Sequence, residues 1–222
     1  MSIDLATAVA GIIFGLALAV PPGPMNAIIA EESVSRGWYA GFLAGFGAML
    51  ADVIFFGLAI LGAATVFDVI DRLEVALFLL GGLLMLIFAV DALTTSIRST
   101  SFTDTDVTVS ATGFQKTLVL GLTNPFQIAF WLTIGLTLVR SGELDIASYL
   151  PLVSEFIVNT GSVSLLGGFF LGIVIWIGIY PAALVAIGER FDAFAPFVAA
   201  LSGVVLLGFG LLFCWVGIDG LL

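Results

Sequence analysis

Six long stretches of apolar residues, separated by short breaks that contain charged residues, dominate this sequence of 222 residues. A helix of about 20 apolar residues, rising about 1.5 Å per residue, crosses the hydrocarbon core of a bilayer. Backbone N–H and C=O groups in lipid must be paired within their own segment, so the stretches are predicted to be helices. The six predicted spans cover residues 5–30, 38–64, 73–93, 117–139, 161–187 and 194–218.

The composition excludes several classes of protein. Hydrophobic residues make up 61% of the chain and charged residues 10%, against about 45–50% and about 25% in soluble domains, so a soluble globule is excluded. The net charge of −10 has the wrong sign for a nucleic-acid partner. The single cysteine and the absence of histidine exclude an internal disulfide, a CxxC site and His-based catalysis or metal binding. We predict no cofactor and no enzymatic activity.

The basic residues predict the orientation in the cell membrane. Cytoplasmic loops are enriched in lysine and arginine, and four of the six basic residues lie in loops one, three and five: Arg36, Arg98, Lys116 and Arg190. We therefore expect both termini outside. The first stretch lacks the basic start of a signal peptide and is expected to remain. Segment 146–158 is too short to cross and is predicted to lie at the interface.

The chain is predicted to be a single membrane domain, 1–222, made of two repeats. A polar linker (about 98–113) divides repeat one (about 1–97) from repeat two (about 114–222). GGLLMLIFA from Gly81 is similar to SGVVLLGFG from Ser202, and Gly41/Gly45 correspond to Gly168/Gly172. Three helices per repeat force the second copy to be inverted, as in secondary transporters whose site lies where broken helices meet. The alternative is chance recurrence of small residues, which permit close helix packing and also permit a homodimer.

Two of the predicted spans contain residues that interrupt a helix. Proline inside a helix costs about 3 kcal/mol, and PPGPMN in the first span has three prolines and a glycine in four residues. Interrupted backbone in a bilayer must be buried in protein or line a wet cavity. A packing kink without a ligand is the alternative. The candidate binding residues at the two breaks are Pro22, Gly23, Pro24 and Asn26, and Thr123, Asn124, Pro125 and Gln127.

Asp52 stands near the middle of the second span. An ionised Asp there costs about 2.5–3.5 kcal/mol on insertion scales, and no Lys, Arg or His lies inside any apolar stretch to pair with it. Asp52 is therefore protonated, hydrogen-bonded to a neighbour such as Asn26 or Asn124, or compensated by a proton, a sodium ion or a substrate ammonium group. Trp176 occupies the corresponding position of repeat two and is a candidate wall of the cavity.

Several of these segments together resemble the LysE/RhtB family of amino-acid exporters: Pro-Gly-Pro-x-Asn at 22–26, SRGWYAGF from Ser35, GFGAMLAD ending at Asp52, TNP at 123–125, and Trp176. The resemblance covers about residues 10–213. It implies a six-helix inverted-repeat exporter of the plasma membrane driven by the proton gradient, with both breaks and Asp52 shaping the pathway. The chain departs from the family's Asn-Pro-Lys because Phe126 stands at the lysine position.

The sequence therefore predicts an all-α polytopic membrane protein with six transmembrane helices, of which the first and fourth are broken. The expected function is proton- or sodium-coupled export of amino acids or related small solutes. A transporter of metal or inorganic cations is the alternative, since hard cations need only oxygen ligands. A membrane enzyme or photoreceptor is disfavoured because the only lysine lies at a helix edge and no buried serine has a base partner. A purely structural protein would need neither the mid-span Asp nor the two breaks.

Overall fold

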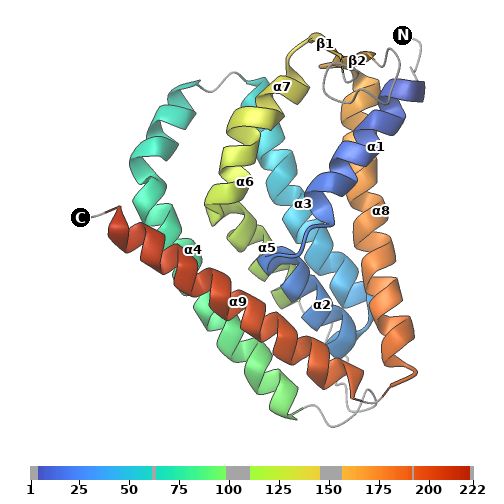
Figure 1. The fold of residues 1–222 in the computed structure, drawn as a ribbon, viewed down its shortest axis with the longest axis vertical. Helices are drawn as coiled ribbons and strands as arrows, with labels where there is room; N and C mark the ends of the chain where they lie inside the picture. Colours follow the sequence, from blue (N-terminus) through green and yellow to red (C-terminus); the bar gives the residue numbers. More distant parts are fainter. Residues whose placement is uncertain (1–4, 62–63, 99–110, 146–156, 192, 221–222) are drawn as a thin grey trace.

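The computed structural model describes residues 5–61, 64–98, 111–145, 157–191 and 193–220. This part of the chain is almost entirely helical, which confirms the predicted all-α class (Figure 1). The helices are α1 (Leu5–Ala19), α2 (Pro24–Arg36), α3 (Trp38–Ile60), α4 (Ala64–Arg98), α5 (Ala111–Thr123), α6 (Pro125–Phe130), the π-helical turn η1 (Trp131–Gly135), α7 (Leu136–Val139), α8 (Val163–Gly188) and α9 (Phe194–Asp219).

Four helices in the described residues are long and apolar enough to cross a membrane by themselves, and the number rises to six if two bent pairs each form one span. The bent pairs are α1 with α2, at 83°, and α5 with α6–α7, at 57°. The interruptions predicted at the two proline motifs are therefore confirmed. The third apolar span is Val75–Thr94, close to its predicted limits of 73–93, and the helix α4 continues beyond both ends of it.

The first span also continues beyond its predicted end. The charged residues Glu31 and Glu32 were expected to mark its boundary, but α2 runs on to Arg36 and buries both carboxyl groups, with residues 4% and 1% exposed. The burial of Glu32 is possible because Arg36 of α2 and Lys116 of α5 lie beside its carboxylate.

Glycine brings α1 and α8 into backbone contact. A Cβ atom at Gly11 or Gly15 would collide with a backbone carbonyl oxygen of α8, and one at Gly168 or Gly172 with a carbonyl oxygen of α1. The glycines therefore alternate across a single interface. Gly82 of α4 and Gly210 of α9 approach each other in the same manner, and Figure 1 shows these two helices side by side along the lower left of the molecule.

We expect Gly168→Ala to lower the stability of the folded protein by about 1–3 kcal/mol, because overpacking a close contact forces the helices apart. Its neighbour Gly167 is the matched control, since a Cβ atom there meets nothing within 4 Å. Thermal unfolding of the purified protein in detergent measures both variants. Equal unfolding midpoints for Gly168→Ala and Gly167→Ala would contradict the packing described.

Gly41 and Gly45, small residues of the kind that permit a homodimer, pack against other helices of the same chain. A Cβ atom at Gly41 would meet Ser33 and Pro181, and one at Gly45 would meet Ile177. Both glycines are buried against α2 and α8, so the face they form is not available to a second copy. Proline 181 itself lies inside α8 without ending the helix.

A two-stranded antiparallel hairpin, β1 (Gly142–Asp145) with β2 (Ile157–Thr160), was not predicted from the sequence. Its strands have only four residues each and alternate too briefly to be recognised. The predicted interfacial segment, 146–158, lies outside the described residues except at its end, where Ile157 and Val158 belong to β2.

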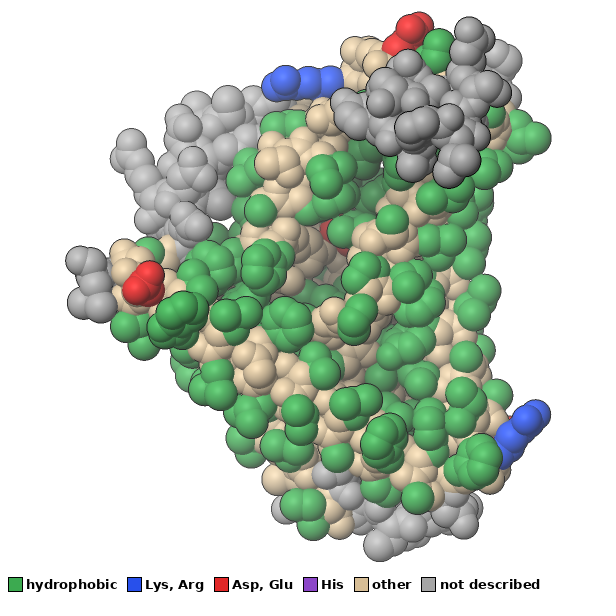
Figure 2. All heavy atoms as spheres, viewed as in Figure 1, with side chains coloured by type: hydrophobic (Ala, Val, Ile, Leu, Met, Phe, Trp, Pro, Cys, Tyr) green, Lys and Arg blue, Asp and Glu red, His purple; other side chains and the backbone are tan. Residues whose placement is uncertain are grey.

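The surface agrees with a membrane environment. On the face shown in Figure 2, hydrophobic side chains cover the middle, and the charged side chains that are visible lie mainly at the upper, lower and left margins. Exposed large apolar residues occur on every long helix, for example Leu83 on α4, Leu171 on α8 and Trp215 on α9. A soluble protein rarely exposes so continuous an apolar surface.

Candidate functional site

A cavity of about 260 Å³ lies where the two bent pairs meet α3 and α8. Both breaks line it, together with residues from the middle of α3 and α8. The lining residues predicted from the sequence are Pro22, Gly23, Pro24, Asn26, Asp52, Asn124, Gln127 and Trp176. Thr123 and Pro125 are not among the lining residues. The remaining lining side chains are mainly apolar, for example Met25, Ile29, Met49, Phe126, Ile173 and Phe209.

Among the described residues, Asp52 is the only charged residue that lines the cavity. It lies on α3 with 6% of its surface exposed. Its Oδ1 accepts a hydrogen bond from Gln127 Nε2 at 2.7 Å and another from Trp131 Nε1 at 2.8 Å. Both donors come from the second half of the broken fourth span. Hydrogen bonds to a carboxylate are stronger than neutral ones, and these two fix the orientation of the Asp52 side chain.

The expected contact between Asp52 and Asn26 or Asn124 is not found, because each asparagine serves the break in its own span. Asn26 Nδ2 donates to the carbonyl oxygens of Ala19, at 2.7 Å, and Pro21, at 2.8 Å. Its Oδ1 accepts from Trp176 Nε1 at 3.0 Å. Asn26 therefore satisfies carbonyl groups left free at the break and ties the break to α8.

Asn124 caps the helix that follows the second break. Its side-chain oxygen accepts a hydrogen bond from the backbone N–H of Phe126 at 3.0 Å. Pro125 occupies the first helical position, where its missing N–H costs nothing. The Thr123 hydroxyl donates back to the carbonyl of Val119, at 2.9 Å. These three residues shape the second break, and of them only Asn124 lines the cavity.

The N-terminus of α2 differs from that of α6 because it has no side-chain cap. Its N-cap residue is Gly23, which has no hydrogen-bonding side chain. The N-terminus of a helix carries unpaired N–H groups and the positive end of the helix dipole, so it attracts anions. Gly23, Pro24 and Met25 line the cavity, and the positive end of α2 therefore lies at the same cavity as the Asp52 carboxylate.

Trp131 is a site residue that the sequence analysis missed. It is 1% exposed and donates to Asp52 from the first residue of η1. Trp131 follows Gln127 by four residues, and side chains four apart lie on the same face of a helix. That spacing was the feature of the sequence from which Trp131 could have been predicted to lie beside Gln127 at the site. Single π-helical turns frequently occur at functional sites.

Phe126, at the lysine position of the family motif, lies among aromatic rings. It is 55% exposed and lines the cavity. Its ring meets that of Phe213 edge-on, with centroids 5.3 Å apart, and that of Phe78 with centroids 6.5 Å apart. An apolar, aromatic wall therefore occupies the place where a lysine would add a positive charge.

Comparison with known proteins identifies the family. The sequence profile of the LysE type translocators matches residues 16–217. The chain is 27% identical to a Bacillus subtilis protein named for amino acid efflux, with 95% of this chain and 96% of that protein aligned. It is 28% identical to an uncharacterised membrane protein of Pseudomonas aeruginosa over 93% of each chain.

The chain is also 32% identical to the leucine efflux protein of Salmonella typhimurium over 114 residues, which cover 50% of this chain and 53% of that protein. No solved structure matches the chain. The family profile begins near the end of α1 and covers the first break, α2 to α8 and all but the last two residues of α9. The chain therefore belongs to the LysE type translocators, a family of membrane transport proteins.

Proposed function

We propose that this protein is a secondary active exporter of amino acids, or of closely related small solutes, in the cell membrane. The observation that carries the proposal is a single carboxylate, Asp52, in a cavity that is bounded by two broken spans and to which the described part of the chain contributes no basic side chain. The names of the relatives, which refer to amino acid and leucine efflux, support the same class of substrate.

The cavity has complementary groups for each part of a zwitterionic amino acid. Asp52 provides a negative charge for an ammonium group, and the uncapped N-terminus of α2 provides N–H groups for a carboxylate. Apolar side chains such as Met49 and Ile173 provide a surface for an aliphatic side chain. The lining residues that the structure describes include no second charge to bind a charged side chain, so neutral amino acids fit the site best.

The position of Asp52 supports proton coupling. An ionised carboxylate in the middle of a span is costly, and the described residues of the cavity lining supply no basic partner for it. A proton and a substrate ammonium group that occupy Asp52 in turn would each satisfy this requirement. Competition at one carboxylate would then link the inward movement of a proton to the outward movement of an amino acid.

The contacts support an inverted-repeat arrangement. The first half of the broken first span, α1, packs on α8, and the first half of the broken fourth span, α5, packs on α3. The second half of each broken span begins with a proline, and the residue two positions later forms a hydrogen bond to the long helix on which the first half packs. Asn26 bonds to Trp176 of α8, and Gln127 bonds to Asp52 of α3. Trp176 and Asp52 therefore occupy corresponding places, as expected for repeats 1–97 and 114–222 of a single membrane domain.

The cation-transport alternative has less support. A hard cation usually takes six or more oxygen ligands, and the cavity lining provides one carboxylate. In the described part of the chain no three His, Cys, Asp or Glu residues are grouped so as to hold a metal ion. Whether sodium takes the place of the proton as the coupling ion is tested by imposing a sodium gradient.

The experiment that tests the proposal uses the full-length protein in proteoliposomes with a panel of labelled solutes: leucine, a basic and an acidic amino acid, and inorganic cations. An imposed pH gradient is expected to drive the accumulation of leucine, and a protonophore to abolish it. Movement of a cation without any amino acid would support the alternative. If a sodium gradient alone drives the accumulation of leucine, the coupling ion is sodium and not the proton.

The hydrogen bond from Trp131 provides a second test. Trp131→Phe keeps an aromatic ring in the core but removes the donor to Asp52. Loss of a hydrogen bond to a charged group costs about 1.5–3 kcal/mol, so we expect leucine transport to fall about ten- to a hundredfold. Trp215→Phe is the control, because Trp215 is 66% exposed on α9. Equal transport by the two variants would remove Trp131 from the site.

A further inference from the structure

A second group of charged residues, of which Glu31 and Glu32 are buried, lies around α2 and apart from the Asp52 cavity. It consists of Glu31, Glu32 and Arg36 of α2, Lys116 of α5 and Asp91 of α4. None of the five lines the cavity. Asn26 does line it, and Glu31 follows Asn26 by five residues, about 7.5 Å along the helix axis. The group therefore lies between the cavity and the membrane surface at which α2 ends.

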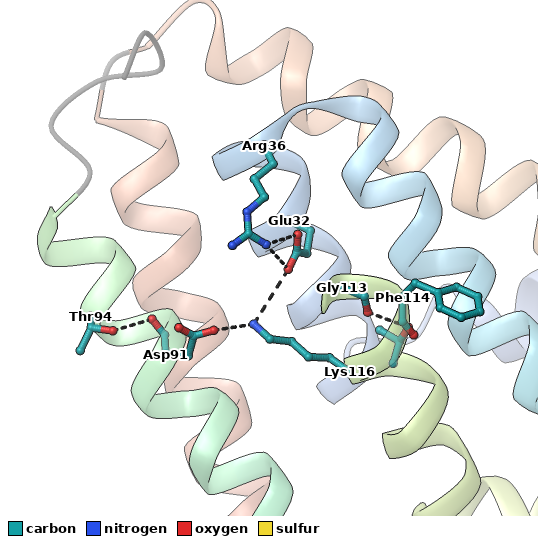
Figure 3. A network of polar contacts seen from close by, with 8 residues as sticks. Glu32, Arg36, Asp91, Thr94, Gly113, Phe114 and Lys116 are labelled. Carbon is teal, nitrogen blue, oxygen red and sulfur yellow. Dashed lines mark hydrogen bonds and ion pairs between the residues drawn. The ribbon is translucent and has the colours of Figure 1, made fainter. Parts of the chain in front are cut away.

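Four of the five residues form a continuous chain of ion pairs (Figure 3). Arg36 donates to both carboxylate oxygens of Glu32, at 2.8 and 2.7 Å. Lys116 donates to Asp91 and lies 3.9 Å from Glu32 Oε1. Glu32 is buried, with its side chain 1% exposed, whereas Asp91 is 52% exposed. Every charge in this chain therefore has a partner of opposite sign.

Glu31 has no such partner. Its residue is 4% exposed, and its Oε2 is buried with no hydrogen-bond partner in the described structure. The charges that act on it are Lys116, Glu32, Asp91 and Arg36. Lys116 and Arg36 are already engaged by other carboxylates, and the described residues of α3, α8 and α9 near α2 contribute no further charge.

The charges of the group do not balance while Glu31 is ionised. Three carboxylates face two basic groups, Lys116 and Arg36, so one negative charge is left over. A buried ionised carboxylate without a hydrogen bond or ion pair is costly. A single proton on Glu31 would cancel the excess charge and remove the bare anionic oxygen.

We propose that Glu31 is a second proton-binding site of the transport cycle, which passes protons between the Asp52 cavity and the aqueous phase next to α2. The proposal rests on the proposed function as a proton-coupled exporter and extends it. Glu31 and Asp52 would then hold protons at two depths along the same route. In the orientation predicted from the basic residues of loops one, three and five, this end of α2 faces the cytoplasm.

The role of the neighbouring ion pairs follows from their connections. Lys116 joins the second half of the first span, α2, to the first half of the fourth span, α5, and to α4. A proton on Glu31 weakens the attraction between Glu31 and Lys116. Lys116 then interacts only with the carboxylates of Asp91 and Glu32 in this group. Protonation of Glu31 would therefore alter how strongly α2 is held to α5.

Infrared spectroscopy of the full-length protein in lipid tests the proposal without any need for transport. A protonated carboxyl group absorbs in its own carbonyl-stretch region, and hydrogen–deuterium exchange shifts that band. We expect the wild-type protein to show a pH-dependent band that is lost in Glu31→Gln, kept in Asp52→Asn and kept in Glu189→Gln, whose residue is exposed. A spectrum of Glu31→Gln identical to that of the wild type would overturn the proposal.

Transport supplies the second measurement. In proteoliposomes Glu31→Gln is expected to lose the dependence of leucine transport on the pH of the aqueous phase next to the end of α2, and Glu31→Asp, which keeps a carboxyl group, to retain it. A pH profile unchanged in Glu31→Gln would also overturn the proposal. If the wild-type protein moves no amino acid at all, the proposed function fails, while the infrared result still decides whether Glu31 binds a proton.

Discussion

Asp52→Asn is expected to abolish the accumulation of leucine against its gradient while leaving the protein folded. The amide oxygen of asparagine can still accept the hydrogen bonds that Gln127 and Trp131 donate to Asp52 Oδ1, so the packing of the site is kept. The variant loses only the charge and the capacity to bind a proton. Uptake of labelled leucine into proteoliposomes under a pH gradient measures this effect.

The matched control is Asp219→Asn, which makes the same chemical change at an exposed position at the end of α9. This variant is expected to transport at the wild-type rate. Thermal unfolding of all three proteins establishes that they are folded equally well. Undiminished accumulation by Asp52→Asn would show that the carboxylate takes no part in coupling.

Filling the cavity is expected to have an effect of similar size. Ala48 lies on α3, four residues before Asp52, and lines the cavity. Ala48→Phe would place an aromatic ring in a volume of about 260 Å³ and leave little room for an amino acid. We expect the loss of both leucine binding and leucine transport, as measured by equilibrium binding in detergent and by uptake into proteoliposomes.

Ala183→Phe provides the comparison, because Ala183 is exposed on α8 and a larger apolar side chain there would face lipid. It is expected to bind and transport normally. If Ala48→Phe binds leucine as tightly as the wild type, the substrate site lies elsewhere and the cavity between the breaks is structural.

The features that depend on strong local physics were predictable from the sequence. Apolar length located the spans, and the density of proline and glycine at 21–24 located the first break. The isolated carboxylate of Asp52 was recognisable because a charge in the middle of a span is costly wherever its side chain points. These arguments need no knowledge of which helices are neighbours.

The features that depend on tertiary contacts were not predictable. Which donors reach Asp52 depends on how α3 packs against the second break, and Gln127 and Trp131 took the place expected for Asn26 and Asn124. Glu31 and Glu32 resemble the end of a span in the sequence, because the partner that allows Glu32 to be buried, Lys116, lies more than 80 positions away. The hairpin β1–β2 forms by pairing of two four-residue segments that are too short to show a clear alternation of apolar and polar residues.

The central claim is that the cavity beside Asp52 is the pathway and opens in turn to each side of the membrane. The most direct measurement is the labelling of Ala48→Cys by a membrane-impermeant thiol reagent, with the native Cys214 replaced by serine. We expect modification from either side of the membrane, and protection by leucine in both cases. Labelling from one side only, with no effect of leucine, would contradict the claim.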